Sequence, residues 1–580
     1  MGESNLIFPC KFRDRYGRNV EIRPYREGDF DQLLDMYDCF EPKAEAQGLP
    51  PAEKVVRDNW VKGILQGDWH VIVWVDDKLA GQAAFFDMGG GRAEWGIFIH
   101  QDYQAAGIGT VLSSLGRVWG SALGLTAAWL VVDTCNERAI SVFRKSGYRI
   151  KGRMDMEVDM DSALNAEHGQ LIRGELAIPD SASFAAIVDE LPLSRPAESK
   201  PCLFINFDFE RRQAPNLLDC ACPIVTYRSS LTKNNCQKSG LLDESFAAVI
   251  EAPVANFASA AAWHDRRYLA NLLLAGAGVT TYAMSERRIG APDAPGFVDV
   301  HKHALRSLGA TLSAARLLVE TPARVAFNPC GGQHEAAPDR AFRQCYINDS
   351  ALAVQYLTAK GLRVLYLDLD AHHGEILQKS FENNPNALTC SFYEAGIPPG
   401  ATGSASDIER FFGDGRPGGH VDVPLPANTN DELYRLAFES VAPVLAGRFR
   451  PDIVVAQISA DTIAADNTSK MCLTCGGYSE ILAMIPSLAP KALFIGGNAG
   501  SPDIIARSYA LAWSALTRDY FNSISRENGG PPVRMCPPDL LSGAFISEET
   551  IPLSPEIFSR NCDCVKDVLY SLRKSNPMLR

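Results

Sequence analysis

The sequence contains no apolar run long enough to span a membrane, and its first residues lack a basic segment followed by a signal-peptide core. Positive charge is also scarce, because 56 Lys and Arg stand against 69 Asp and Glu, for a net charge of −13. This balance argues against broad binding to nucleic acids or anionic membranes, which basic patches drive. We therefore expect a cytoplasmic protein with neither kind of partner, and the sequence does not indicate an oligomeric state.

The 15 cysteines lack the spacing of a disulfide framework. Three close pairs suggest metal binding, but none has a second pair at zinc-finger spacing: Cys220 with Cys222, Cys472 with Cys475, and Cys562 with Cys564. We expect reduced, structural thiols, as is usual in the cytosol.

The length of 580 residues, with 46% apolar and 22% charged residues, predicts an ordinary globular protein of two or more domains. We expect a first domain at residues 17–160, a linker and unassigned segment at 161–222, and a second domain at 223–575. In the second domain, strand and helix patterns alternate, which predicts an α/β fold with a mainly parallel sheet between helices.

The most informative segment is residues 364–375, an apolar run typical of a buried strand that ends in carboxylates and imidazoles. Asp370 and His372 are two residues apart at the strand end, so both side chains point the same way and can share one cation. In open α/β sheets the ligand crevice lies beyond the carboxyl ends of the strands. The alternative is that these residues only cap the next helix; a second acidic strand end, at Asp461, favours the metal site.

In the first domain, a glycine-rich segment lies between a predicted strand at 93–99 and a predicted helix that ends near Leu123. Glycines at 107 and 109 allow close approach of a ligand, and the helix start offers unpaired N–H groups and positive potential. The pattern predicts a phosphate-binding loop. A Rossmann site is excluded because no strand ending in an acidic residue follows about 20 residues later within a βαβ unit.

This domain resembles the GNAT acyltransferases, an α+β family whose pyrophosphate loop has the form Q/R-x-x-G-x-G/A. The resemblance implies acetyl-CoA or another acyl-CoA as co-substrate, with Asn136 near the pantetheine arm and Glu94 as the general base. For Glu94 the alternative is an ordinary surface carboxylate. Many members have a tyrosine acid where this chain has Phe143, so Tyr148 or water would protonate the thiolate. The residues expected to hold the coenzyme are Gln104, Ala105, Ala106, Gly107, Ile108, Gly109, Thr110 and Asn136.

The second domain resembles the histone deacetylase and acetylpolyamine amidohydrolase family of the arginase–deacetylase fold. Matching segments occur in the family's order: residues 264–269 with its early helix, 331–336 with G-G-x-H-H-A, 345–349 with C-Y-x-N-D, 365–375 with D-L-D-x-H-H-G-D, and 457–461 with Q-x-G-A-D.

The resemblance implies that Asp370, His372 and Asp461 bind one Zn²⁺, in the three-ligand arrangement of catalytic zinc. The metal would activate water and polarise a carbonyl oxygen. Asp368 would pair with His334 and, with Ser391, line a site for a monovalent cation such as K⁺.

The sequence departs from the family at several catalytic positions. The proton-transfer histidine is replaced by Glu335, and its supporting aspartate by Glu375. The glycine run at 496–500 is followed by no tyrosine until Tyr509. The aromatic walls of the acetyl-lysine channel are replaced by Gln344 and Pro398, and a rim glycine by Arg343.

These changes predict that the domain does not deacetylate protein lysines. They also predict that Arg343 and Gln344 bind a small substrate that carries a carboxylate or phosphate. Glu335 can still act as a general base, as glutamate does in other zinc hydrolases.

We therefore expect a bifunctional enzyme of specialised metabolism. It would transfer an acyl group to a small amine, and its zinc domain would hydrolyse or cyclise the resulting amide. Two alternatives remain open: a catalytically retired scaffold behind an active acyltransferase, and reversible acetylation of protein lysines.

Overall fold

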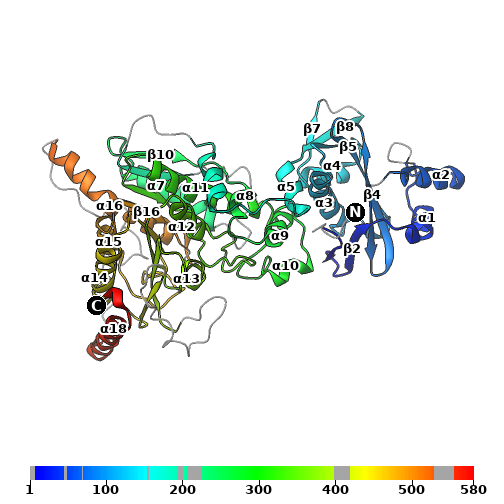
Figure 1. Cartoon of the computed structure of the whole chain (residues 1–580). Coiled ribbons are helices and arrows are strands. Elements are labelled where there is room, and N and C mark those ends of the chain that lie inside the picture. The colour runs from blue at the N-terminus through cyan, green and yellow to red at the C-terminus, as the bar shows by residue number, and fades with distance from the viewer. Residues whose placement is uncertain are drawn as a thin grey trace. The chain divides into compact units, whose positions relative to one another are not determined.

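The computed structural model describes residues 7–44, 49–67, 69–152, 156–193, 200–206, 224–396, 419–497, 500–527 and 554–579. The chain forms two compact units, one of Met1–Ala177 with Asp265–His301, the other of Ile178–His264 with Lys302–Arg580. Each is built on its own eight-stranded sheet (Figure 1). Pro398 and the pair Cys220 and Cys222 lie outside the described residues. Within the described part of the chain, no helix has both the length and the apolar character needed to cross a bilayer.

The first unit has a mixed sheet in the order β1-β2-β3-β4-β5-β6-β8-β7. In most of its strands apolar residues alternate, so that one side of the strand faces the core. In β6, for example, buried and half-buried residues alternate. The strands are β1 Cys10–Arg13, β2 Asn19–Pro24, β3 His70–Val75, β4 Lys78–Asp87, β5 Arg92–Ile99, β6 Ala127–Asp133, β7 Arg149–Lys151 and β8 Glu157–Ala163. The helices are α1 Phe30–Asp38, α2 Lys54–Ile64, α3 Ile108–Ala122, α4 Glu137–Lys145, α5 Ala166–Ile172, α9 Arg266–Gly276 and α10 Tyr282–Glu286.

The helices α9 and α10 group with the first unit, although they come about 90 residues after α5 in the chain. Arg266, at the start of α9, donates hydrogen bonds to the carbonyl oxygens of Gly174 and Leu176 at 2.6 and 2.9 Å. These bonds satisfy carbonyl groups of the turn that follows α5.

The second unit has an all-parallel sheet in the order β10-β9-β11-β16-β15-β12-β13-β14. Its central strands are apolar on both faces because helices cover both, as expected for a parallel sheet. The strands are β9 Cys202–Asn206, β10 Ala247–Glu251, β11 Val325–Asn328, β12 Val364–Leu369, β13 Ala387–Glu394, β14 His420–Leu425, β15 Ile453–Ile458 and β16 Lys491–Ile495.

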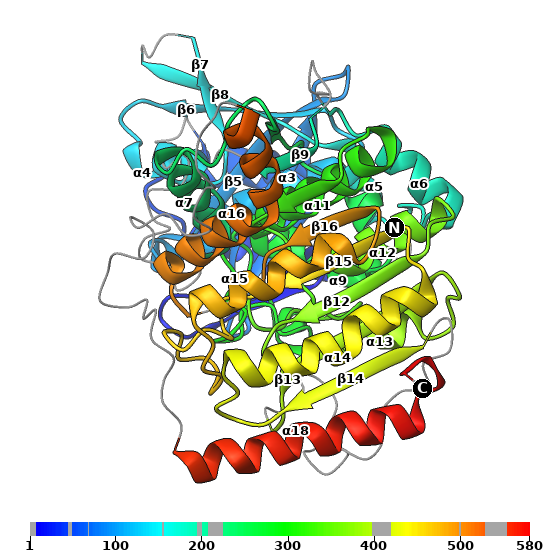
Figure 2. The ribbon, with the colours of Figure 1, turned by 90° about the vertical axis from the view of Figure 1, so that its left-hand side faces the viewer.

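Helices α14, α15 and α16 cover the face of this sheet that is turned toward the viewer in Figure 2, and α11 and α12 lie behind it. The C-terminal α18 packs beside α14 and the edge strand β14. The helices are α6 Ser181–Asp189, α7 Ile224–Lys238, α8 Phe257–Ala260, α11 Val300–Glu320, α12 Asp349–Ala359, α13 Glu375–Phe381, α14 Asp431–Phe449, α15 Cys475–Met484, α16 Pro502–Glu527 and α18 Pro555–Ser575.

The structure confirms the predicted fold class, a GNAT-like α+β part followed by a mainly parallel α/β part. The expected linker at 161–222 differs from what is seen. β8 extends to Ala163 in the first sheet, and β9 lies between β10 and β11 in the second. The sequence could not place β9 because its partners lie more than 40 residues away in the chain, and pairing in a parallel sheet leaves no local turn signal.

Candidate metal centre and coenzyme loop

The candidate metal ligands lie where two neighbouring strands of the second sheet end. β12 pairs with β15 in parallel, from Val364 opposite Ile453 to Leu369 opposite Ile458. Asp370 and His372 follow β12, and Asp461 follows β15, so the pairing brings the three side chains to one edge of the sheet.

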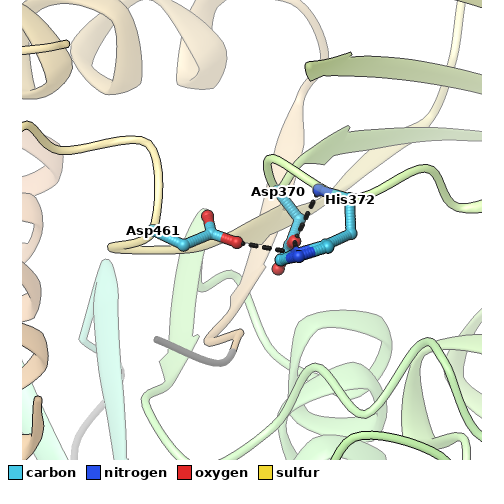
Figure 3. A group of neighbouring side chains, drawn as sticks. All are labelled: Asp370, His372 and Asp461. Atoms are coloured by element: carbon cyan, nitrogen blue, oxygen red, sulfur yellow. Dashed lines mark hydrogen bonds and ion pairs between the residues drawn. The ribbon is translucent and has the colours of Figure 1, made fainter. Parts of the chain in front are cut away.

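Asp370, His372 and Asp461 each offer one ligand atom, and these atoms lie within 4.8 Å of one another (Figure 3). Nδ1 of His372 is 2.9 Å from Oδ1 of Asp370 and 3.0 Å from Oδ2 of Asp461. Both carboxylates are almost fully buried, with 2% and 1% of their surface exposed. The arrangement is compact enough for one small cation.

The two carboxylates surround the imidazole of His372 with negative charge. Burial alone would lower the pKa of His372, but hydrogen bonds with Asp370 and Asp461 raise it to about 11. Burial and the charge of Asp370 raise the pKa of Asp461 to about 7. For Asp370 burial acts in the same direction, but His334 and His372 outweigh it and hold its pKa below the ordinary range. Two buried carboxylates are costly without a positive partner, and with the imidazole they form a donor set suited to Zn²⁺.

A second imidazole–carboxylate pair lies beside this site. Nδ1 of His334 is 2.7 Å from Oδ2 of Asp368, and burial of His334 is outweighed by Asp368 and Asp370, which raise its pKa to about 10. The Tyr366 hydroxyl donates to the same Asp368 oxygen at 3.3 Å. Asp368 faces Ser391 across the β12–β13 pairing, so the two residues expected to line the monovalent cation site are neighbours. The cation itself remains a prediction.

Glu335, predicted to replace the family's second histidine, is buried and directly follows His334. Burial raises its pKa, and the charges of His334, His372 and Arg343 oppose that shift. Nη1 of Arg343 donates to Oε1 of Glu335 at 3.3 Å. Glu375 forms an ion pair with Lys379 in the first turns of α13. The structure therefore brings Glu335 and Arg343 together at the metal centre.

Gly500, predicted to stand in place of the family's tyrosine, has no side chain to offer. The next tyrosine, Tyr509, is completely buried, and its hydroxyl accepts the N–H of Gly497 at 2.6 Å. The same hydroxyl lies 2.8 Å from the carbonyl oxygen of Gly497 and 3.2 Å from that of Ile458. Tyr509 thus holds the backbone of the glycine run together.

Arg228, on α7, supports the site although nothing in the sequence indicates it. It is fully buried and donates to the carbonyl oxygens of Cys330, Gly331 and Gly497, the first two at 3.0 and 2.7 Å. It therefore ties the loop after β11 to the glycine run after β16, the strand that pairs with β15. No motif marks it, since its partners are backbone atoms far away in the sequence.

In the first unit, the predicted coenzyme loop leads into α3. Gly107 is the N-terminal cap of α3 with φ +89°, and Ala105 also has a positive φ of +59°. Gln104 donates to the carbonyl oxygen of Ile99 at 3.0 Å and accepts from Nη1 of Arg138 at 3.2 Å. Asn136 caps α4 by accepting the N–H of Ala139 at 3.0 Å. The loop leads directly into the 15-residue helix α3, which begins with Ile108, Gly109 and Thr110. The carbonyl oxygen of Ala106, in the loop, accepts the N–H of Arg15 at 3.1 Å.

Glu94 lies where two strands separate. β5 and β6 pair in parallel only as far as Glu94 opposite Trp129, although β5 continues to Ile99 and β6 to Asp133. Glu94 is half-buried, and burial raises its pKa. Tyr148, one of the two candidate acids, is 2% exposed with its ring 5.6 Å from that of Phe143, and burial raises its pKa.

An all-parallel sheet with two carboxylates and an imidazole at its carboxyl edge defines the second unit as an α/β protein suited to metal binding. A model of the histone deacetylase domain matches residues 222–516, and a model of the GNAT acetyltransferase family matches residues 30–148. The chain belongs to the histone deacetylase family and also contains a GNAT acetyltransferase domain.

The relatives agree with this assignment. Acetoin utilization protein AcuC of Bacillus subtilis is 33% identical over 331 residues, which cover 53% of this chain and 83% of that protein. Histone deacetylase 8 of Xenopus tropicalis is 33% identical over 296 residues, 50% of this chain and 78% of that protein. A solved structure of an HDAC homologue complexed with SAHA is similar in fold, with a TM-score of 0.50 at 22% identity over 64% of this chain and 100% of that chain.

Proposed function

We propose that this protein is a bifunctional enzyme of specialised metabolism that acts on a small molecule. Its first unit transfers an acyl group from acyl-CoA to an amine, and its second unit processes that amide or a related one with the help of Zn²⁺. The proposal is supported above all by the convergence of Asp370, His372 and Asp461. Three protein ligands are the number found at catalytic zinc, where water or substrate takes the fourth position.

When bound, Zn²⁺ would supply Lewis-acid polarisation of the amide carbonyl. Glu335 would accept the proton of the attacking group, water in a hydrolysis or an internal nucleophile in a cyclisation, and return it to the leaving atom. The pair of His334 and Asp368 would hold positive charge beside the reacting carbonyl, with a supporting K⁺ expected near Asp368 and Ser391.

Lysine deacetylation is disfavoured by the residues around this site. Gly500 offers no hydroxyl for the developing oxyanion, and loss of one such donor costs about 3 kcal/mol in other hydrolases. Arg343 and Gln344 replace apolar surface at the rim with polar groups. They favour a small amide that carries an anionic group over an extended acyl-lysine chain.

Mass spectrometry of the purified protein with acetyl-CoA and a cell extract tests the proposal. We expect one substrate to gain the mass of an acetyl group, followed by a second mass change that is lost when a chelator removes zinc. A protein that carries about one zinc per chain yet produces no second, chelator-sensitive change would contradict the role of the second unit.

A second candidate is a retired deacetylase domain that serves as a scaffold for the acyltransferase. The observation that favours it is the use of Tyr509 as a backbone clamp, which leaves the site without the family's tyrosine. In this case acetyl transfer would proceed, and zinc content would not affect any product. The third alternative, reversible acetylation of protein lysines, requires release of acetate from acetyl-lysine peptides, and we expect none.

A further inference from the structure

Residues 342–345 form a tight turn of a kind that rarely carries large side chains. Phe342 and Cys345 exchange backbone hydrogen bonds at 3.1 and 2.7 Å, and between them Arg343 and Gln344 have φ values of +41° and +63°. Two-residue turns with both central residues at positive φ favour Asn and Gly, because a β-carbon is crowded there. Backbone strain of this type persists where the surrounding structure imposes it, and it is concentrated at functional sites.

The surrounding structure does hold this turn in place. The N–H groups of Tyr346 and Ile347 donate to the side-chain oxygen of Gln333 at 2.8 and 3.3 Å. Gln333 directly precedes His334, so the turn is anchored to the loop that carries His334 and Glu335. The strained backbone consequently fixes where the Arg343 side chain begins, next to Glu335.

The Arg343 side chain connects solvent to the buried carboxylate of Glu335. One third of the Arg343 side chain is exposed, against 9% of the Glu335 side chain. Their contact, 3.3 Å between Nη1 and Oε1, is longer than the 2.7–2.9 Å usual for charge-assisted hydrogen bonds. A carboxylate or phosphate that docks on the guanidinium at the usual distance can therefore compete with Glu335.

Glu335 also borders the cluster around the candidate metal ligands through the chain. It directly follows His334, whose Nε2 lies 3.8 Å from Oδ2 of Asp370. While Arg343 is paired with Glu335, the guanidinium occupies Oε1 of this carboxylate. Removal of that contact would leave the oxygen available to the attacking group.

We propose that the Arg343–Glu335 ion pair is the resting state of an anion site, and that a carboxylate or phosphate of the amide substrate takes Arg343 away from Glu335. This inference rests on the proposed amide-processing function and adds its substrate class, a small amide with an anionic group. Occupation of Arg343 identifies the correct substrate and at the same time frees Glu335 to accept the proton of the attacking group. In hydrolysis the carbonyl–nitrogen bond breaks, a carbonyl–oxygen bond forms, and the proton passes through Glu335 to the leaving nitrogen.

The test measures binding of hydroxamates to the zinc-loaded protein by calorimetry. Short hydroxamates of two to five carbons are compared in pairs, one neutral and one with a terminal carboxylate. The preference is the ratio of the two dissociation constants. We expect the anionic member of the best pair to bind at least about tenfold tighter, because the guanidinium fork matches a carboxylate.

Three variants separate the ion pair from a simple charge effect. Arg343→Gln should abolish the preference. Glu335→Gln should increase it severalfold, because the competing carboxylate is gone. Arg340→Gln should leave it unchanged, since this arginine lies on the same loop but pairs with Asp339 at 3.0 and 3.3 Å. Each preference is a ratio within one variant, so a general loss of hydroxamate affinity cancels.

Equal binding of both members by the wild-type protein would overturn the proposal, as would a preference that stays the same or falls in Glu335→Gln. If Glu335→Gln fails to fold, Glu335→Ala removes the same competing carboxylate and should raise the preference in the same way. Failure of every hydroxamate to bind the zinc-loaded protein would instead count against the proposed metal-dependent function.

Discussion

The backbone N–H of Gly500 donates a 2.7 Å hydrogen bond to Oδ2 of Asp466. Asp466 belongs to the loop after β15 and also accepts the N–H of Thr468 at 2.9 Å. A β-carbon on residue 500 would lie 2.8 Å from Oδ1 of Asn467 and 3.4 Å from Oδ2 of Asp466. The loop therefore lies against the position from which a side chain on residue 500 would extend.

Gly500→Tyr should not restore deacetylase activity. The new side chain starts against Asn467, so we expect a loss of about 1–3 kcal/mol in the free energy of unfolding and no release of acetate from an acetyl-lysine peptide. The double variant with Asn467→Gly should recover most of this stability. Urea unfolding and an acetate assay measure both outcomes, and a stable, active single variant would show that the loop does not block the position.

Asp370→Asn should remove the metal. A ligand carboxylate becomes a neutral amide, so zinc content should fall from about one equivalent to below about 0.1 per chain, measured by elemental analysis. Chelator-sensitive turnover should disappear with it, while acetyl-CoA binding stays. Asp503→Asn is a matched control because Asp503 is 66% exposed at the start of α16. Zinc retained at the wild-type level in Asp370→Asn would rule out the proposed ligand set.

Glu94→Gln should slow acyl transfer by about 10²–10⁴-fold, the usual contribution of a general base. Since burial raises the pKa of Glu94 and a base acts in its deprotonated form, the wild-type rate should rise with pH through a midpoint above the ordinary glutamate value of 4.5. The variant should lose this rise. Asp77→Asn, on the exposed β3–β4 turn, should keep both rate and profile. An unchanged pH profile in Glu94→Gln would assign the base elsewhere.

Gly107→Ala should weaken acetyl-CoA binding. Its φ of +89° is unfavourable for alanine by about 1–2 kcal/mol, and the added methyl would meet the Arg15 side chain at 3.4 Å. Distortion of the loop should raise the dissociation constant about tenfold or more in calorimetry. Gly124→Ala is the control, because Gly124 has a φ of +83° with no atom within 4 Å and lies past the other end of α3. Equal losses in both variants would point to helix stability instead of the loop.

Much of the fold could be predicted because its signals are local. The strand at 364–369 is apolar except for Asp368, and the structure shows it as β12 with every residue buried. The loop at 104–110 was recognisable because glycine at a positive φ before a helix is a short-range pattern. Metal ligands could be proposed because parallel strands release their side chains at a common edge, and β12 pairs with β15.

Other features depended on contacts between distant parts of the chain. The partners of β9, the three carbonyl groups held by Arg228, and the clamp made by Tyr509 involve backbone atoms that no motif describes. The same holds for the pairing of Arg343 with Glu335, since the sequence shows both residues but not the strained turn that brings them together.

The amino-acid sequence by itself determined which strands are buried and which side chains leave their ends, because periodicity and short motifs act over a few residues. The tertiary structure alone decided how those ends are supported. Hydrogen bonds to backbone atoms and strained φ values arise when remote segments pack together. They leave no periodic pattern of residues in a single sequence.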